Sequence, residues 1–217
     1  MIKIENEKVL GFEAAIRGMR NPMNSWNRSD SFYDTANEVY VVGENDLRLM
    51  TNLAKSGCEH RKYLRMICVS FDITAPVYFM NEFDTYKIGV TRNSTSFMHK
   101  GLSKDFEISD FEIDKEMYDK NDIVKDTWID IIATLNCLKD DYYDEKDESY
   151  FHTIREILPM SYKYRSTISL NYEVLLNIYI QRKNHRLPEW KEFCKWILTL
   201  PYMKEIIKGM GVIESEN

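Results

Sequence analysis

The sequence TRNSTSFMH, at positions 91–99, holds a dense group of side chains that could recognise a small anionic ligand. Hydroxyl groups, an amide and a guanidinium follow one another here, and all of them can donate hydrogen bonds to the oxygens of a phosphate or a sugar. We therefore interpret this segment as a candidate ligand-binding loop. A capped loop rich in Ser, Thr and Asn is the alternative that composition alone leaves open.

A second set of candidates lies in residues 157–201, which overlap a segment with an excess of basic residues. From Arg155 to Lys191 there are seven basic and three acidic residues, whereas the whole chain has a net charge of −6. A local excess of positive charge on an acidic protein indicates an anion site, and a helix surface that is simply basic is the alternative. Arg165, after the sequence SYKY, is either an anion ligand or a surface arginine.

His185 and Glu189 lie four residues apart and could suggest a metal site. A zinc site in a protein needs three or four ligands, and no third candidate lies nearby in the sequence. We therefore predict no metal. Trp190 and Trp196 are expected in the core or at an interface.

The elements that position these candidates can be read from hydrophobic periodicity. Apolar residues alternate with polar ones over residues 67–74, which predicts a half-buried strand, and Ala75-Pro76 ends it before a helix. The other expected elements are short strands at Lys3–Phe12 and Glu38–Gly43, helices at 43–57, 124–138 and 171–183, and a helix opened by Pro188. The helix at 43–57 is expected to be capped by Glu44 or Asn45 and stopped by Gly57. The expected helix faces are Val77, Met80, Asn81 and Asp84 after Pro76, Trp128, Ile131, Ile132 and Leu135 in 124–138, and Trp190, Phe193, Cys194 and Ile197 turned inward after Pro188. Residues 18–32 and 101–124 are expected to be irregular, and 139–149 a solvated loop or an exposed helix start.

Length and composition favour one domain. With 217 residues and 44% apolar content the chain can bury one substantial core, so we predict a single α/β (α+β) domain over residues 1–217. An acidic loop or helical insertion is expected around residues 101–150.

Charge, cysteine spacing and hydropathy restrict the surroundings of the protein. The acidic net charge argues against a nucleic-acid partner, and no apolar run is long enough for a membrane span. The start of the chain lacks the layout of a secretory signal, so a soluble, cytoplasmic protein is expected. The four cysteines form no CxxC pair and are predicted to be reduced thiols.

The segments at about 60–100 and 157–200 together resemble the flavin-dependent thymidylate synthases, the ThyX family. The signature of that family, RHRxxSxNxxSxRY, follows a strand, an Ala-Pro turn and a helix, which is the order expected here. The positions that fall on the signature are Thr85-Tyr86-Lys87 for Arg-His-Arg, Thr91 for the first Ser, Asn93 for the Asn, Ser96 for the second Ser and Met98-His99 for Arg-Tyr.

The same resemblance continues on either side of this signature. Upstream, His60 matches the first His of the family pattern HxSxxEH, Arg65-Met66 replaces its Glu-His, and Ser70 takes the place of a hydroxyl residue on the strand. Downstream, the family shows Leu-Pro, an Arg, an Asn-containing helix that ends in Arg, and then HAQxEIR. The matching positions here are Leu158-Pro159, Arg165, Asn171, Asn177, Arg182, His185, Glu189 and Lys191.

The resemblance implies a compact fold with a central, mostly antiparallel sheet flanked by helices and a helical C-terminal part. It also implies a homotetramer that binds FAD and dUMP at sites shared between subunits. Such enzymes move a methylene group from methylenetetrahydrofolate to C5 of dUMP, with FAD reduced by NADPH as the hydride source. No cysteine of the protein attacks the pyrimidine.

Carried over residue by residue, the resemblance assigns three sets of positions. The catalytic set is Lys191 and Arg182. The dUMP set is Arg92, Asn93, Ser94, Ser96, Arg165 and Lys191. The FAD set is His60, Ser70, Thr85, Tyr86, Lys87, Asn93, Asn177 and His185. For Asn177, a core amide bonded to a neighbouring helix is the alternative.

Three departures from the family pattern keep other functions open. Lys191 stands where the family has an arginine, Met98 replaces a phosphate-binding arginine, and Lys87 is the one basic residue left in the Arg-His-Arg triplet. A lysine supplies the charge but lacks the planar fork of an arginine. The alternatives are a related flavoenzyme that modifies a pyrimidine nucleotide differently, such as by hydroxymethylation, and a non-catalytic nucleotide-binding homologue.

Overall fold

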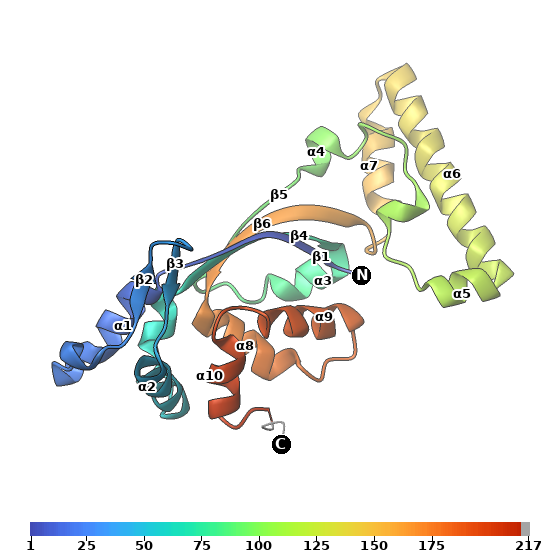
Figure 1. Cartoon of the computed structure of the whole chain (residues 1–217). Coiled ribbons are helices and arrows are strands. Elements are labelled where there is room, and N and C mark those ends of the chain that lie inside the picture. Colours follow the sequence, from blue (N-terminus) through green and yellow to red (C-terminus); the bar gives the residue numbers. More distant parts are fainter. Residues whose placement is uncertain (214–217) are drawn as a thin grey trace. The chain divides into compact units, whose positions relative to one another are not determined.

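The computed structural model describes residues 1–213, and Figure 1 shows the chain with its elements labelled. The strands are β1 (Lys3–Leu10), β2 (Phe32–Asp34), β3 (Val39–Val41), β4 (Cys68–Pro76), β5 (Thr91–Ser94) and β6 (Lys163–Asn171). The α-helices are α1 (Phe12–Arg20), α2 (Glu44–Lys55), α3 (Val77–Phe83), α4 (Phe97–Lys100), α5 (Lys115–Lys120), α6 (Asp122–Glu145), α7 (Glu148–Ile157), α8 (Tyr172–Arg182), α9 (Pro188–Ile197) and α10 (Met203–Gly209). The short 3-10 helices are η1 (Asn21–Met23), η2 (Trp26–Arg28), η3 (Lys62–Met66) and η4 (Ile108–Asp110).

The main sheet has the strand order β1-β4-β6-β5, and β2 and β3 form a separate antiparallel pair. On β4 the predicted alternation is confirmed, because Val69, Phe71 and Ile73 are buried and the residues between them are not. On the opposite face, the Asp72 carboxylate accepts hydrogen bonds from Asn6 Nδ2 (2.8 Å) and Thr167 Oγ1 (2.5 Å). This carboxylate therefore ties β1 and β6 to β4. The predicted class, a mostly antiparallel sheet with helices, is confirmed.

The chain forms two compact units. The first comprises Met1–Lys3, Ile73–Thr85 and Asn93–Ser166. Its helical part has a core of its own, in which the apolar face predicted for α6 packs against α7. The buried members are Leu102, Phe106, Phe111, Leu135, Phe151 and Ile154. The helix α6 continues to Glu145, through most of the segment expected as a loop or helix start. That the chain is one domain stays a prediction.

The second unit comprises Ile4–Asp72, Tyr86–Arg92 and the described residues from Thr167 onward. Its core is aromatic where α9 packs on β4: the ring centroids of Phe71 and Trp196 are 4.5 Å apart, and those of Phe193 and Trp196 are 5.1 Å apart. The helix predicted from Pro188 is confirmed. The residues expected to face inward, Trp190, Phe193, Cys194 and Ile197, are all buried.

Two local expectations were incomplete. The helix α1 was not predicted, although its buried residues Phe12, Ala15, Ile16 and Met19 have helical spacing. In α3 the buried face is Phe79, Met80 and Phe83, not the stripe through Asn81 and Asp84. The large aromatic side chains decide this face because they remove the most apolar surface from water.

A residue close in sequence ends α2, whereas a residue distant in sequence caps its start. Gly57 takes the left-handed conformation expected of a helix stop, with φ 118°. The predicted cap by Glu44 or Asn45 is wrong. The Asp30 carboxylate, from outside the helix, accepts hydrogen bonds from the backbone N–H groups of Asn45 (2.8 Å) and Asp46 (3.0 Å).

A buried ion pair joins α1 to α2. Arg20 Nε donates to Asp46 Oδ1 at 2.6 Å, and neither side chain is more than 4% exposed. The other carboxylate oxygen accepts from the hydroxyls of Ser29 and Ser31, both at 2.6 Å. Burial alone would raise the pKa of Asp46, but these hydroxyl groups and Arg20 outweigh it and hold the pKa below its ordinary value.

We expect Asp46→Asn to destabilise the protein by about 3 kcal/mol at neutral pH, because Arg20 then stays buried without its counterion. The depressed pKa means that the native carboxylate contributes its stability above pH 3.8 and loses it as pH falls through the folded-state pKa. The stability difference between the native protein and Asp46→Asn should therefore shrink below about pH 4. Urea unfolding from pH 3 to 7 measures it, with Glu13→Gln, in an exposed pair with Arg17, as the control.

Candidate functional site

Within the second unit, three of the predicted site residues are brought together around Trp190. Arg182, at the end of α8, donates from Nε to the hydroxyl of Tyr86 at 2.9 Å. Its guanidinium carbon lies 4.7 Å from the ring centroid of Trp190 and 5.7 Å from that of Tyr86. His185 contacts the same indole edge-on, at 6.2 Å between ring centroids. The result is a partly exposed cation held between two aromatic rings, with an imidazole beside them.

The interactions in this cluster fix the direction of each polar group. The Tyr86 hydroxyl donates in turn to Gln181 Oε1 at 2.9 Å, so its acceptor side is directed to Arg182. The Leu187 N–H donates to His185 Nδ1 at 3.3 Å, which places the hydrogen of a neutral His185 on Nε2. The contact of Arg182 with Trp190 is worth about 1 kcal/mol. Arg182 is therefore held in place by both rings and a hydrogen bond.

The secondary structure explains why these residues meet. Asn171 caps α8 by accepting from the Val174 N–H at 3.1 Å, and α8 ends at Arg182. A short turn carries His185, and Pro188 then starts α9, whose third residue is Trp190. Figure 1 shows α8 and α9, in orange and red, joined by this turn.

A second polar group lies earlier on α8. Arg61 donates from Nη2 to Asn177 Oδ1 at 3.1 Å and pairs with Glu173 through Nε at 3.4 Å. Arg65 also pairs with Glu173, which is buried. Asn177 is therefore a polar residue with a partner inside the protein, which fits the core alternative, and its assignment to FAD stays a prediction.

In the first unit, residues 93–96 lie beside the SYKYRS segment at 161–166. The strand β5 is the neighbour of β6, and the Thr95 N–H donates to the Arg165 carbonyl at 2.9 Å. The pairing places Arg165 of β6 next to the edge segment that contains Asn93, Ser94 and Ser96. All four residues are exposed. Two segments about 70 positions apart in sequence thus form one exposed polar edge.

The remaining predicted residues are more scattered. His60 is exposed in the turn after α2, and Ser70 is half-buried on β4. Thr85, which follows the C-cap residue of α3, donates to the Glu82 carbonyl at 2.7 Å. Arg92, partly buried on β5, and the exposed Lys87 and Lys191 belong to the second unit. Lys191 follows the buried Trp190 directly on α9 and so projects from another face of that helix.

Sequence reasoning missed four members of these groups. Gln181, Arg61 and Glu173 gave no signal apart from their charge or polarity, because their partners lie about 95 to 116 positions away. Trp190 was expected in the core, which is confirmed, but it also carries the cation contact. Because only a short turn separates Arg182 from the helix that Pro188 starts, the sequence could have indicated that Arg182 lies near the first residues of that helix.

The cysteine nearest to the cluster is not activated. Burial raises the pKa of the Cys194 thiol to about 11, although the charge of Arg182 opposes the shift. At neutral pH only about one molecule in ten thousand carries the Cys194 thiolate, which is the nucleophilic form. Cys194 is therefore a packing residue on α9.

In residues 1–213, no three His, Cys, Asp or Glu side chains form a group that could hold a metal ion. None of the helices in this range is long and apolar enough to cross a membrane.

Comparisons with known proteins give no match to any protein-family model or curated sequence. Solved structures, in contrast, match along nearly the whole chain. The flavin-dependent thymidylate synthase ThyX from Helicobacter pylori, with FAD and dUMP, is similar at a TM-score of 0.70 and 14% identity over 97% of this chain and 99% of that one. The UMP/dUMP methylase PolB from Streptomyces cacaoi, with 5-Br dUMP, is similar at a TM-score of 0.64 and 14% identity over 99% and 98% of the two chains. The chain therefore has the fold of the flavin-dependent thymidylate synthases.

Proposed function

We propose that this protein is a flavin-dependent enzyme that methylates C5 of a uracil nucleotide, converting dUMP to dTMP. Methylenetetrahydrofolate would donate the carbon, and NADPH would reduce the flavin. We further propose a cytoplasmic homotetramer. The observation that carries the proposal is the arrangement of Tyr86, Arg182 and His185 around Trp190, on a fold shared with solved structures that hold FAD and dUMP.

The residues of this cluster fit a flavin in chemical type. The polar edge of a flavin ring presents carbonyl oxygens and ring nitrogens, which take hydrogen bonds from cationic and N–H donors. Arg182 offers a planar set of donors beside two aromatic rings, and His185 and Lys87 lie on the adjoining segments. When bound and reduced, FAD supplies the hydride that completes the methyl group.

The second requirement is a site for the nucleotide phosphate. Arg165 with Ser94 and Ser96 provides a cation and two hydroxyl groups on the paired strands β5 and β6. Arginine binds phosphate through paired hydrogen bonds, and hydroxyl groups add further donors. We assign these residues, with Asn93, to the phosphate and sugar of the nucleotide. For Arg92, which belongs to the second unit, the assignment to dUMP stays a prediction from the resemblance.

The uracil ring must gain enolate character before C5 can attack the methylene carbon. A fixed positive charge near a uracil carbonyl stabilises the negative charge that develops there. We assign this role to Arg182 and Lys191, of which Arg182 is the one held by aromatic and hydrogen-bond contacts. Cys194, as a neutral thiol, has no part in the attack on the ring.

Methylation of UMP in place of dUMP is the second candidate, because the similar structure of PolB is that of a UMP/dUMP methylase. The two substrates differ by the 2′-hydroxyl group. A side-by-side assay with both nucleotides distinguishes them.

The first test is flavin uptake. We expect the purified protein to show the visible absorption of bound FAD, or to acquire it when FAD is added and excess is removed. A protein that stays colourless under both conditions would contradict every flavin-dependent reaction proposed for it.

The second test separates the two cations. We expect Arg182→Gln and Lys191→Gln each to lower the release of tritium from 5-tritiated dUMP at least about tenfold, because each removes a charge near the developing enolate. Lys195→Gln is the matched control, because Lys195 is an exposed lysine on α9, the helix that also carries Lys191. This variant should retain activity. Release unchanged in either variant removes that residue from the mechanism.

The third test concerns the support of Arg182. Tyr86→Phe keeps the aromatic ring but removes the hydroxyl that bonds Arg182 Nε and Gln181. Loss of one hydrogen bond to a charged group should reduce kcat/KM about tenfold. Tyr33→Phe, on the exposed strand β2, is the control, and equal activity of the two variants would show that the Tyr86 hydroxyl does not support Arg182.

A further inference from the structure

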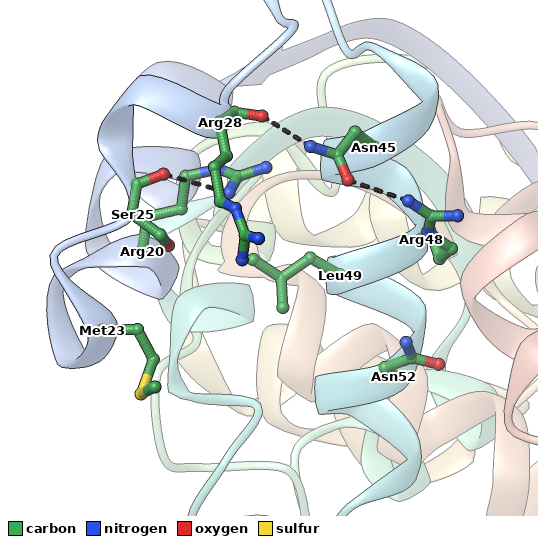
Figure 2. A pocket seen from close by; sticks show the side chains of 8 residues that line it. All are labelled: Arg20, Met23, Ser25, Arg28, Asn45, Arg48, Leu49 and Asn52. Atoms are coloured by element: carbon green, nitrogen blue, oxygen red, sulfur yellow. Dashed lines mark hydrogen bonds between the residues drawn. The ribbon is translucent and has the colours of Figure 1, made fainter.

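A pocket of about 380 Å³ lies where α1, η1 and η2 meet α2, apart from the residues assigned above. Figure 2 shows it, with Arg20, Met23, Ser25 and Arg28 on one side and residues of α2 on the other. The full lining is Arg20, Met23, Ser25, Arg28, Asn45, Arg48, Leu49 and Asn52. Three arginines and no carboxylate line this pocket of an acidic protein.

Arg20 provides the buried part of the pocket wall. Its side chain is 4% exposed, its Nε bonds Asp46 and its Nη1 donates to the Ser25 carbonyl at 3.1 Å. Among the described residues, however, Arg20 Nη2 has no hydrogen-bond partner although it is buried. A buried donor on a charged group is costly to leave unpaired, which indicates that a group from outside the protein pairs with it.

Asn45 bonds both the Arg48 side chain and the backbone of Arg28. Arg48 Nη2 donates to Asn45 Oδ1 at 3.0 Å, and Asn45 Nδ2 donates to the Arg28 carbonyl at 2.5 Å (Figure 2). One amide thus connects η2 to α2 and orients the Arg48 side chain. A site arranged before binding loses less entropy when a ligand arrives.

The carboxylates around the pocket are mostly engaged elsewhere. Asp46 pairs with Arg20, and Asp30 accepts from the first backbone N–H groups of α2. Glu44 lies with Asp30 in an adjoining hollow that shares Asn45 and Arg48. Arg28 and Arg48 therefore give the pocket two positive charges, and no carboxylate lies in its lining.

We propose that this pocket binds a small phosphorylated ligand, whose phosphate oxygens accept hydrogen bonds from Arg28 and Arg48, with the buried Arg20 guanidinium in the pocket wall behind them. Planar guanidinium groups match phosphate oxygens in geometry, and several of them together favour a doubly charged group. The volume is near the lower limit of ligand pockets, which favours a phosphate or pyrophosphate group with a small remainder over a dinucleotide.

Calorimetric titration with inorganic pyrophosphate tests this assignment on the full chain. We expect saturable binding of one pyrophosphate at the pocket, and Arg28→Gln and Arg48→Gln each to weaken it about tenfold, the worth of one charge-assisted hydrogen bond. Arg17→Gln is the matched control, because Arg17 is an exposed arginine of α1 outside the pocket. Its dissociation constant should stay within about twofold of the native value.

Three results would overturn the proposal: no saturable binding by the native protein, equal affinities of Arg28→Gln and Arg17→Gln, or citrate binding as tightly as pyrophosphate. Loss of binding in Arg165→Gln but not in Arg48→Gln would place the pyrophosphate at the nucleotide site instead. Circular dichroism melting of each variant identifies any that is unfolded. Failure of flavin uptake would leave this pocket unaffected, so the two proposals are tested independently.

Discussion

The packing of α9 on β4 is the constraint on which the candidate site depends. Phe71 of the strand and Phe193 and Trp196 of the helix form a contiguous aromatic group, and Trp190 extends it with a centroid 5.9 Å from that of Phe193. Large buried rings fix the position of a helix because any shift opens a cavity in a closely packed core. This packing fixes Trp190. Because the guanidinium of Arg182 lies against the Trp190 ring, the position of Arg182 depends on the packing of the core.

Two buried carboxylates of this protein form ion pairs with arginines. Asp46 joins Arg20, and Glu173 joins Arg61 and Arg65, in both cases between segments far apart in the chain. Removing one partner of such a pair is costly, so these contacts restrict how α1, α2, η3 and α8 can pack. The contacts of Arg182 include the Tyr86 hydroxyl and the aromatic rings of Tyr86 and Trp190, so π-systems as well as polar groups hold this guanidinium.

The structural similarity to solved proteins supports a conclusion about the fold, whereas the low sequence identity does not by itself support one about function. At 14% identity the shared fold reflects the order of elements and the burial pattern, which many sequences can satisfy. The function rests instead on particular side chains, and several of these depart from the family pattern. Thr85-Tyr86-Lys87 stands where the resemblance aligns the Arg-His-Arg of the family, and its central residue Tyr86 accepts a hydrogen bond from Arg182.

By itself the sequence determined the elements with strong periodicity: β4, the apolar faces of α6 and α9, and the Gly57 stop of α2 follow from spacing and backbone preference, which are local properties. It also indicated that the segments around Asn93 and Arg165 belong together. Only the tertiary structure decided that β5 pairs with β6, that Asp30 caps α2, and that Arg61 takes the amide of Asn177. Such contacts join residues that are distant in the chain, and local periodicity carries no information about them.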